Sequence, residues 1–425
     1  MACLGSVAAP TGNGRSAVTE TKPFTIEKRV VFEAYKRVRA KKGSAGVDGE
    51  SLEAFEADLG NNLYKLWNRL SSGSYHPQPV KRVEIDKGDG SKRPLGIPTV
   101  TDRIAQMTVK LLIEPDIDSQ FHQDSYGYRP GKSAHQALKQ ARSRCYERAW
   151  VLDLDIKGFF DNLDHDLLNK ALDRHVTEPW QRLYIQRWLN APIRYADGSE
   201  RIPGKGTPQG GVISPLLANL YLHYVFDVWI ERHRPGIRFE RYADDIVCHC
   251  VSEWDALELK VLLETRFAAC GLTLHPDKTR IVHCKGVGYR KHYKTVSFDF
   301  LGYCFRPRWL KDKLGRHCLY FTAEISRKSA KAIRQEINRW PWHYWVQKEL
   351  EDIRRYSVAR LRGWMEYFGL FGKSGIRDVL FHFDKRLTRW AMRKYKQLNR
   401  MMKAARKISE TQKKHPWGFP HWQRS

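Results

Sequence analysis

The run Phe239-Glu-Arg-Tyr-Ala-Asp-Asp-Ile-Val-Cys-His-Cys250 places two adjacent aspartates between two short apolar segments. Neighbouring side chains on a strand point to opposite faces, and Asp-Asp is a poor strand dipeptide. The pattern therefore predicts a β-hairpin with Asp244 and Asp245 at its tight turn. Such a pair is either an ordinary solvated turn or a set of ligands for a hard divalent cation such as Mg²⁺. The remainder of the sequence has to decide between these two interpretations.

A second acidic segment, Trp150-Val-Leu-Asp-Leu-Asp-Ile-Lys-Gly-Phe-Phe-Asp161, begins as a strand. Strand alternation puts Val151, Asp153 and Asp155 on one face. A carboxylate inside an apolar strand is unfavourable unless it is paired or bound to a metal. Asp155 lies nearer the end of the strand, so it is the better candidate to join the two aspartates of the hairpin.

Two further segments have the composition of phosphate-binding elements. Glycine and proline dominate Gly204–Gly211, which lets the backbone approach a ligand closely, and Ser214-Pro215 then predicts the start of a helix. The segment Val80–Pro98 alternates strand residues around Lys87-Gly-Asp-Gly90, which predicts a basic hairpin. That hairpin is either a grip for a triphosphate or a solvated charged turn. A helix that begins near Thr101 is expected to end at Pro115.

The composition of the chain favours a polyanionic partner. The 425 residues include 74 Lys or Arg and 47 Asp or Glu, a net charge of +27. Nucleic acid is the leading candidate, because 14 Trp, 19 Tyr and 18 Phe also provide stacking surfaces, and an anionic membrane surface is the alternative. No apolar run approaches the roughly 20 residues that span a bilayer, and the first residues lack the apolar core of a signal peptide. We therefore expect a soluble, cytoplasmic protein without a membrane partner.

The eight cysteines form no Cys-x-x-Cys pair, so neither a zinc site nor a disulfide framework is expected. Cys248-His249-Cys250 is interpreted as a strand. From Ser326 onward the sequence is predicted to be helical, and these 100 residues hold 25 basic and 8 acidic residues and 7 of the 14 tryptophans. A basic helical segment with many aromatic residues favours nucleic-acid contact.

Seven motifs in order carry a resemblance to a known family. They resemble the motif series of reverse transcriptases encoded by group II introns, and the motifs are Arg93-Pro-Leu-Gly-Ile-Pro98, Tyr126-Gly-Tyr-Arg-Pro130, Asp155-Ile-Lys-Gly-Phe-Phe-Asp161, Gly206-Thr-Pro-Gln-Gly-Gly211, Tyr242-Ala-Asp-Asp245, Leu274-His-Pro-Asp-Lys-Thr279 and Phe300-Leu-Gly-Tyr303. The basic tail resembles the helical thumb, or maturase domain, of the same family. No Cys- and His-rich segment follows it, so the resemblance is to the form without a C-terminal endonuclease.

The resemblance implies an α+β fold, a right-hand polymerase with fingers, a palm of antiparallel strands backed by helices, and an α-helical thumb. The domains expected from it are a flexible leader at 1–24, an N-terminal extension with fingers at 25–145, a palm with some fingers elements at 146–305, and the helical thumb or maturase domain at 306–425. It implies that Asp155, Asp244 and Asp245, with the backbone of Ile156, hold two Mg²⁺ ions, for which Mn²⁺ would substitute.

Further site residues follow from the same resemblance. The deoxynucleotide-binding set is Lys87, Arg93, Phe160, Gln209 and Lys278, in which Phe160 matches the bulky position that excludes a ribose 2′-hydroxyl. Lys278 is either a group near the leaving pyrophosphate or a structural lysine on a turn. Asp153 matches no catalytic position and is expected to be a hydrogen-bonded palm residue. The set expected to contact template and primer is Arg129, Gly210, Gly211, Tyr242, Leu301 and Gly302.

The implied function is RNA-directed DNA synthesis coupled to binding and splicing of an intron RNA. The expected partners are the group II intron RNA, an RNA template with a DNA primer, dNTPs and target DNA. Two alternatives remain: a reverse transcriptase of another bacterial lineage, serving defence or diversity generation, and a splicing maturase with vestigial polymerase activity. The presence of Asp155, Asp244, Asp245, Phe160 and Gln209 argues against the second.

Overall fold

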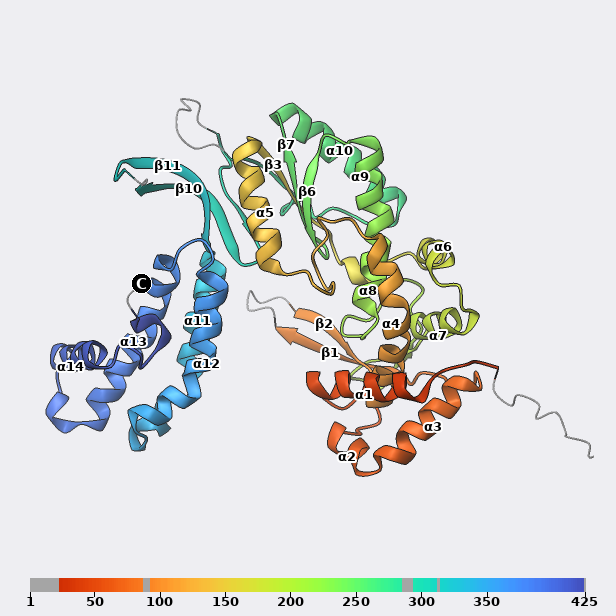
Figure 1. Ribbon diagram of the computed structural model, residues 1–425, viewed down its shortest axis with the longest axis horizontal. Coiled ribbons are helices and arrows are strands. Elements are labelled where there is room, and N and C mark those ends of the chain that lie inside the picture. The colour runs from red at the N-terminus through yellow and green to blue at the C-terminus, as the bar shows by residue number, and fades with distance from the viewer. Residues whose placement is uncertain (1–22, 87–91, 285–292, 312–313, 424–425) are drawn as a thin grey trace, which may run out of the picture. The chain divides into compact units, whose positions relative to one another are not determined.

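The computed structural model describes residues 23–86, 92–284, 293–311 and 314–423 (Figure 1). The chain divides into two compact units, and each is described by itself. The first contains the residues up to Asp116 together with Leu172–Ser214, and the second contains Ile117–Ala171 and everything from Pro215 onward. The chain therefore leaves the first unit, returns to it and leaves it again.

The first unit combines helices with a four-stranded sheet in the order β2-β1-β4-β5. Its elements are α1 (Lys28–Lys41), α2 (Leu52–Ala57), α3 (Leu59–Ser71), β1 (Val80–Asp86), β2 (Lys92–Ile97), most of α4 (Val100–Gln120), α7 (Pro179–Leu189), β4 (Ile193–Arg194) and β5 (Glu200–Arg201). Strands β1 and β2 are antiparallel, with Val83 opposite Leu95, which confirms the predicted hairpin. The tip of that hairpin, residues 87–91, lies outside the described residues.

Helix α4 corrects one expectation from the sequence. It does not end at Pro115 but continues through it to Gln120. Proline lacks the N–H that would bond to the carbonyl four residues earlier, so the helix loses a hydrogen bond there. Ile113 and Ile117 flank the proline and are buried at 4 % and 0 % exposure. Burial of this apolar face compensates for the lost hydrogen bond, and local helix propensity alone does not include it.

The second unit is built around an antiparallel sheet in the order β6-β7-β3-β8. Its strands are β3 (Trp150–Asp155), β6 (Arg238–Tyr242), β7 (Asp245–Cys250) and β8 (Arg280–His283). Around it lie α5 (Ala134–Glu147), the 3₁₀ turn η1 (Phe159–Asp161), α6 (His165–His175), α8 (Ser214–Leu222), the π-helical turn η2 (His223–Asp227), α9 (Val228–His233) and α10 (Glu253–Ala269). Helix α6 begins in this unit and ends in the other.

One face of this sheet packs against α5. Val151, Val247 and Val282, from three adjacent strands, belong to one apolar cluster with Ala137, Leu138 and Ala141 of the helix. Helix α10 contacts β3, β7 and β8. The expected strand at residues 248–250 is confirmed as part of β7, and His249 is not a metal ligand there, because its Nε2 bonds Glu240 Oε2 at 2.6 Å.

Three more strands precede the C-terminal helices. They are β9 (Phe298–Phe300), β10 (Tyr303–Lys311) and β11 (His317–Ile325), in the order β11-β10-β9. Leu301 and Gly302 form the two-residue turn between β9 and β10, and both have positive φ (50° and 80°). This combination is typical of a type I′ hairpin turn. Because the strands extend to Ile325, the described residues among 306–325, the start of the range expected for the helical thumb, are not helical.

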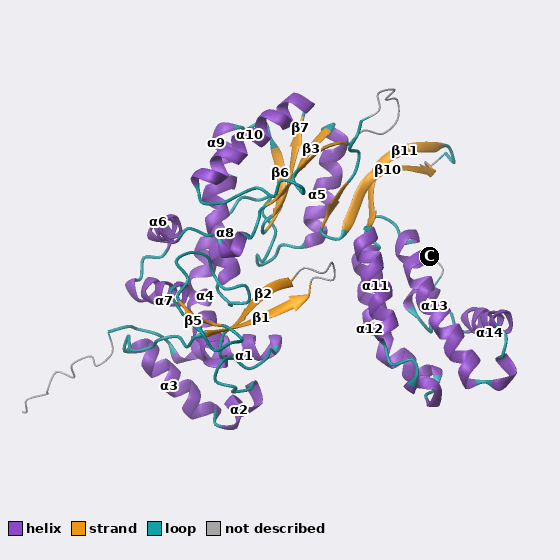
Figure 2. Ribbon diagram, turned by 180° about the vertical axis from the view of Figure 1, so that it is seen from behind, coloured by secondary structure: helices purple, strands orange, loops and turns teal. Residues whose placement is uncertain are grey.

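The described residues from Arg327 onward are helical, as predicted (Figure 2). The α-helices are α11 (Arg327–Arg339), α12 (Leu350–Phe368), α13 (Ser374–Lys394) and α14 (Met401–Lys414), with short 3₁₀ turns at Tyr344–Gln347, Lys396–Leu398 and Pro420–Trp422. Most tryptophans of this segment form its core and not a stacking surface: Trp340, Trp342, Trp345, Trp390 and Trp422 are all buried. Trp364 is partly buried against this core, and Trp417 is 76 % exposed. Throughout the described chain, no helix has the length and apolar character needed to cross a membrane.

Candidate active site

The aspartate pair lies on a tight hairpin, one residue away from its predicted register. Tyr242 pairs with Asp245, so Ala243 and Asp244 are the turn residues and Asp245 is the first residue of β7. Ala243 has φ +58°, a conformation that is unfavourable for a residue with a Cβ and that glycine usually occupies in two-residue hairpins. The prediction of a hairpin is confirmed, and the placement of Asp245 within the turn was wrong. As a strand residue, Asp245 is held by the sheet.

Asp155 lies directly opposite Asp245. The register of β3 and β7 pairs these two residues at one end of the antiparallel ladder. Side chains that face each other across such a ladder have Cβ atoms about 5 Å apart, and like charges there are destabilising. The structure thus brings together two of the three carboxylates that the sequence singled out, and Asp244 is the next residue along the chain.

Burial and, after it, the charges of neighbouring carboxylates raise pKa values in this region. Burial, followed by the charges of Asp153, Asp244 and Asp155, raises the pKa of Asp245 to about 8, although a hydrogen bond from the Leu301 backbone opposes the rise. Asp245 is therefore protonated over much of the neutral range. Bringing a divalent cation to the site would favour the ionised form.

Asp153 lies two residues before Asp155, on the same face of β3, and is buried. Burial raises its pKa to about 7, against the opposing charge of Arg280, whose Nη2 lies 3.3 Å from Asp153 Oδ2. The structure confirms that Asp153 is a hydrogen-bonded residue of the sheet. Arg280, its partner, was not singled out from the sequence, although a buried carboxylate on a strand is a signal to search for a cation on the neighbouring strand.

Lys278 supplies the positive charge nearest to Asp155. Its Nζ lies 2.8 Å from Asp155 Oδ2. The turn that carries Lys278 is attached to the same strand by a bond from His275 N to Asp155 O (2.7 Å). Ile156 and Leu274 form an antiparallel bridge, made by this bond and by that from Lys157 N to Thr273 O (2.9 Å). Neither bond uses the Ile156 carbonyl, the predicted backbone ligand of a metal.

The carboxylates of Asp155, Asp244 and Asp245 are chemically suitable ligands for Mg²⁺, but they are not arranged as a complete coordination site. In the described parts of the chain, no three Asp, Glu, His or Cys side chains are gathered closely enough to hold a metal ion as they stand. The oxygens of Asp155 and Asp245 are hard ligands on facing strands, and a lysine already compensates one of them. A divalent cation at this point would replace the Lys278 ammonium group as the counter-charge of Asp155. The residues present therefore fit Mg²⁺.

Phe160 lies on the 3₁₀ turn η1, a short distance along the chain after Asp155. Gly158, with φ +58°, precedes this turn in the left-handed conformation. The ring of Phe160 is only 7 % exposed and packs edge-to-face on Phe159, with ring centroids 5.4 Å apart. The side chain that was predicted to exclude the 2′-hydroxyl is therefore held in a fixed position.

Two of the predicted dNTP-binding residues meet in the first unit. Arg93 Nε donates to Gln209 Oε1 at 2.7 Å, and Gly96 N donates to Gln209 O at 2.6 Å. A Cβ on Gly210 would lie 2.4 Å from the Gly96 carbonyl oxygen. Gly210 therefore allows two backbone segments to approach each other. The sequence had instead suggested that glycine is needed here so that the backbone can approach a ligand. Lys87 lies outside the described residues.

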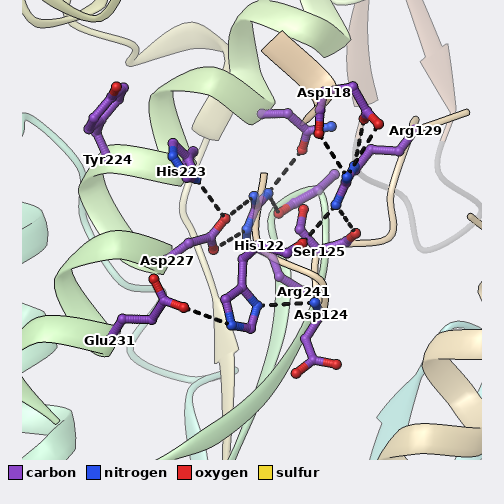
Figure 3. A network of polar contacts seen from close by, with 12 residues as sticks. Asp118, His122, Asp124, Ser125, Arg129, His223, Tyr224, Asp227, Glu231 and Arg241 are labelled. Carbon is purple, nitrogen blue, oxygen red and sulfur yellow. Dashed lines mark hydrogen bonds and ion pairs between the residues drawn. The ribbon is translucent and has the colours of Figure 1, made fainter. Parts of the chain in front are cut away.

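The residues predicted to contact template and primer occupy varied environments. The side chain of Arg129 is 7 % exposed, and its guanidinium bonds Asp118 and the carbonyls of His122 and Ser125, inside the second unit (Figure 3). Gly302 O accepts bonds from Ser326 N and Ser329 Oγ, so its carbonyl is used by the start of α11. The remaining members are Tyr242, which ends β6, Leu301, whose backbone bonds Asp245, and Gly210 and Gly211 in the first unit.

A buried ion pair beneath the hairpin was not predicted. Arg241 and Asp227 are both 0 % exposed and form two hydrogen bonds, Nε to Oδ1 at 2.7 Å and Nη2 to Oδ2 at 2.6 Å (Figure 3). Arg241 lies in β6 three residues before Asp244, and a charged residue in a strand is the signal in the sequence that points to such a partner. The partner is Asp227 because the π-helical turn η2 places that residue beside Arg241, and the periodicity of the sequence does not predict a π-helical turn.

Comparisons with known proteins agree with this geometry. Residues 85–305 match the family model described as reverse transcriptase (RNA-dependent DNA polymerase), and residues 330–408 match the group II intron, maturase-specific domain. Protein YkfC of Escherichia coli is 36 % identical over 279 residues, which cover 56 % of this chain and 72 % of YkfC. The group II intron-encoded protein LtrA of Lactococcus lactis is 34 % identical over 203 residues, 47 % of this chain. That alignment spans only 33 % of LtrA.

A more distant similarity reaches another lineage of the same enzymes. The retron Ec48 reverse transcriptase of Escherichia coli is 25 % identical over 273 residues, 60 % of this chain and 62 % of that protein. The reverse transcriptase domain covers the antiparallel sheet with its acidic hairpin, and the maturase-specific domain covers the helices from α11 to α14. The chain belongs to the reverse transcriptase family and carries a segment that matches the group II intron, maturase-specific domain.

Proposed function

We propose that this chain is an RNA-directed DNA polymerase that binds a group II intron RNA, assists its splicing and copies it into DNA with Mg²⁺ as cofactor. The observation that carries the proposal is the direct pairing of Asp155 with Asp245 across β3 and β7. Two facing carboxylates in a sheet repel each other unless a positive charge lies between them, and they bind a divalent cation well. The reverse transcriptase domain identifies the reaction in which such a cation would act.

Asp155, Asp244 and Asp245, with the Ile156 carbonyl, would hold the metal. Two ions bound there would supply acidity to the primer 3′-hydroxyl and neutralise charge on the leaving pyrophosphate, and Mn²⁺ is expected to replace Mg²⁺. For binding to occur, Asp245 must lose the proton that its raised pKa retains. Asp155 must also exchange its ion pair with Lys278 for the metal. Lys278 would then be released toward the phosphates of the incoming nucleotide, close to the leaving group.

The remaining residues would select and hold the substrates. Arg93 and Gln209 already form a hydrogen-bonded pair, and they would bind the triphosphate and the nascent base pair. Phe160, fixed by Phe159, would exclude the ribose 2′-hydroxyl. The proposed nucleic-acid partners are an RNA template with a DNA primer, the intron RNA and a target DNA.

Primer extension on an RNA template tests the polymerase part of the proposal. Wild-type protein with Mg²⁺ and dNTPs should extend a DNA primer, and Asp244→Ala should abolish extension without reducing the affinity for primer–template. Lys65→Ala, an exposed charge change on α3, is the control and should extend normally. Full extension by Asp244→Ala would reject the metal assignment, and no extension by wild-type protein under any divalent cation would reject the polymerase proposal.

A second candidate is a reverse transcriptase of another lineage, which the retron similarity favours. The two differ in the RNA that the helices from α11 to α14 recognise. Splicing of an RNA transcribed from the DNA around the reading frame separates them. Protein-dependent splicing of that RNA supports the maturase proposal, whereas extension without any spliced RNA supports the other lineage.

A further inference from the structure

The ion pair between Arg241 and Asp227 lies directly behind the hairpin that carries the acidic residues. Arg241 is in β6, two residues before the turn residue Ala243. Both charged side chains are fully buried. A buried ion pair contributes little net stability, because desolvation of two charges offsets most of their attraction. Stability alone therefore does not account for a charged pair at this point in the fold.

Arg241 also reaches the turn itself. Its Nη1 donates to the carbonyl oxygen of Ala243 at 3.3 Å and to Asn219 Oδ1 at 2.9 Å. Asn219 Nδ2 donates in turn to Gly127 O at 2.7 Å. A single guanidinium thus connects the carboxylate of Asp227, the amide of a helix residue and the carbonyl that immediately precedes Asp244.

The backbone of Arg241 is fixed as firmly as its side chain. Its N–H donates to Asp124 O at 3.0 Å, and its carbonyl accepts from Tyr126 N at 2.8 Å. On the same side, a Cβ on Gly127 would lie 2.4 Å from Ala243 N, so only glycine allows this segment to pack against the turn. Residues 124–127 and the guanidinium therefore hold the turn from two directions.

The partner carboxylate is delivered by an irregular turn. Asp227 is the last residue of the π-helical turn η2, between α8 and α9. Single π-helical turns inside α-helices are uncommon and recur at functional sites. The widened turn brings Asp227 to the guanidinium, where it forms both hydrogen bonds (Figure 3).

We propose that Arg241, Asp227 and Asn219 form a positioning network that holds Ala243 in its left-handed conformation and so fixes Asp244 and Asp245 for metal binding. The inference rests on the proposed metal-dependent polymerase function. A positive φ is unfavourable for alanine, and the hydrogen bond to its carbonyl opposes relaxation of the turn. None of the three network residues touches the substrate or the metal in this scheme.

The experiment replaces the pair by an apolar pair of similar size, Arg241→Met with Asp227→Leu. Such replacements of buried ion pairs often preserve or increase stability, so the variant is expected to fold. If the pair serves positioning, Mn²⁺ affinity measured by electron paramagnetic resonance without nucleotide should fall about 10- to 100-fold, as for other outer contacts of metal sites. The kcat for primer extension should fall by a similar factor, while the affinity for primer–template and the unfolding midpoint remain unchanged.

A matched control makes the same type of change elsewhere. Lys110 and Glu114 form an i,i+4 ion pair on α4 at 3.3 Å, with both side chains mostly buried. Lys110→Met with Glu114→Leu should leave Mn²⁺ affinity and kcat at wild-type values. Wild-type Mn²⁺ affinity in the Arg241→Met, Asp227→Leu variant would overturn the inference, and failure of wild-type protein to bind Mn²⁺ would instead reject the proposed function.

Two single variants keep the inference testable if the double variant does not fold. Arg241→Lys keeps the charge but offers one donor group in place of the bidentate fork. Asn219→Ala keeps the ion pair and removes the hydrogen bonds that Asn219 makes with Arg241 and Gly127. Both should weaken Mn²⁺ binding, Arg241→Lys more strongly, and wild-type affinity in both would overturn the positioning role.

Discussion

Asp155 and Asp245 face each other across β3 and β7, and the only cation described in contact with either is Lys278, bonded to Asp155. The sheet therefore carries an electrostatic conflict at one end. The conflict is partly relieved by the lysine and partly by protonation of Asp245, whose pKa is raised to about 8. A site of this type trades stability of the metal-free protein for affinity toward a divalent cation.

Asp245→Asn should stabilise the metal-free protein while abolishing primer extension. Because the folded-state pKa is raised, native wild-type protein retains a proton that the unfolded chain loses, so its stability decreases as pH rises from about 4 to about 8. The neutral amide avoids this loss. We expect a gain of about 1 kcal/mol at pH 8 and almost none at pH 4, measured by urea unfolding. Addition of Mg²⁺ should narrow the difference at pH 8, and a variant less stable than wild type at that pH would contradict the repulsion argument.

His249 should give stability the opposite sign of pH dependence from an ordinary buried histidine. Burial, the largest single cause, lowers its pKa, but the charge of Glu240 and the hydrogen bonds to Cys145 and Glu240 together raise the pKa to about 10. The imidazolium therefore contributes stability that is fully present below the unfolded pKa of about 6.5 and is lost as pH rises toward 10. Urea unfolding of wild-type protein and His249→Gln between pH 6 and 10 measures this. The stability difference between the two should shrink with rising pH, and a difference that stays constant above about pH 7 would show that the histidine is neutral.

Replacement of Phe160 by a smaller side chain should admit ribonucleotides. Phe160→Val is preferable to alanine, because removal of a buried Phe to Ala costs about 3–5 kcal/mol of stability. The ratio of kcat/KM for dNTP to that for rNTP should decrease by at least about 10-fold, since one removed clash is worth upwards of about 1.4 kcal/mol. Phe55→Leu, a change of a buried ring on α2, is the control and should keep the wild-type ratio. Unchanged discrimination in Phe160→Val would remove this residue from sugar selection.

Arg93 and Gln209 should behave as one unit in nucleotide binding. Because Arg93 Nε donates to Gln209 Oε1, removal of either side chain leaves the other misplaced. We expect Arg93→Ala and Gln209→Ala each to raise the KM for dNTP. The double variant should be little worse than either single one, a coupling of about 0.5–3 kcal/mol in a double-mutant cycle. Lys92→Ala, which breaks the surface ion pair with Glu84, is the control and should leave the KM unchanged. Additive effects would show that the two residues act separately.

Helix α14 should contribute to RNA affinity through charge. Lys403 and Lys407 lie on its exposed side. Each phosphate contact with a single strand adds about 0.7 to the slope of log affinity against log salt concentration. Lys403→Ala with Lys407→Ala should therefore reduce that slope by about 1.4, measured by filter binding of the intron RNA at several salt concentrations. The control, Lys170→Ala with Lys260→Ala, removes the same charge from α6 and α10 and should reduce the slope less. Equal slopes for the two double variants would show that Lys403 and Lys407 make no phosphate contact.

The sequence predicted the elements well where a pattern is local. Alternation identified β3, and the acidic turn identified the β6–β7 hairpin, because both depend on neighbouring residues. The error of one residue at Asp245 arose because the register of a hairpin depends on which residue adopts a positive φ, and Ala243 is an unusual choice. Helix α4 continues through Pro115 because burial of its apolar face outweighs the local preference of proline to end a helix.

Contacts between distant segments were beyond the reach of pattern analysis. The pairing of Arg241 with Asp227 depends on a π-helical turn, and the contact of Gln209 with Arg93 spans more than a hundred residues. The tryptophans of the C-terminal segment show the same limit, because composition reveals their number but not that most of them fill a core. Family resemblance supplied the roles of Asp155, Asp244 and Asp245, and the structure supplied the reason that the first and third repel each other.

The path of the chain between its two units has a consequence for biosynthesis and for protein engineering. The first unit contains residues up to Asp116 and then Leu172–Ser214, with part of the second unit encoded between them. On the ribosome, the first unit cannot be completed until Ser214 has emerged, by which time Asp155 has long been synthesised and still lacks β7. A split protein divided at Asp116 would keep the second unit whole but would remove Leu172–Ser214 from the first unit. A division after Ser214 would keep the first unit whole but would separate β3, with Asp155, from β7, so no single cut in the chain yields two complete units.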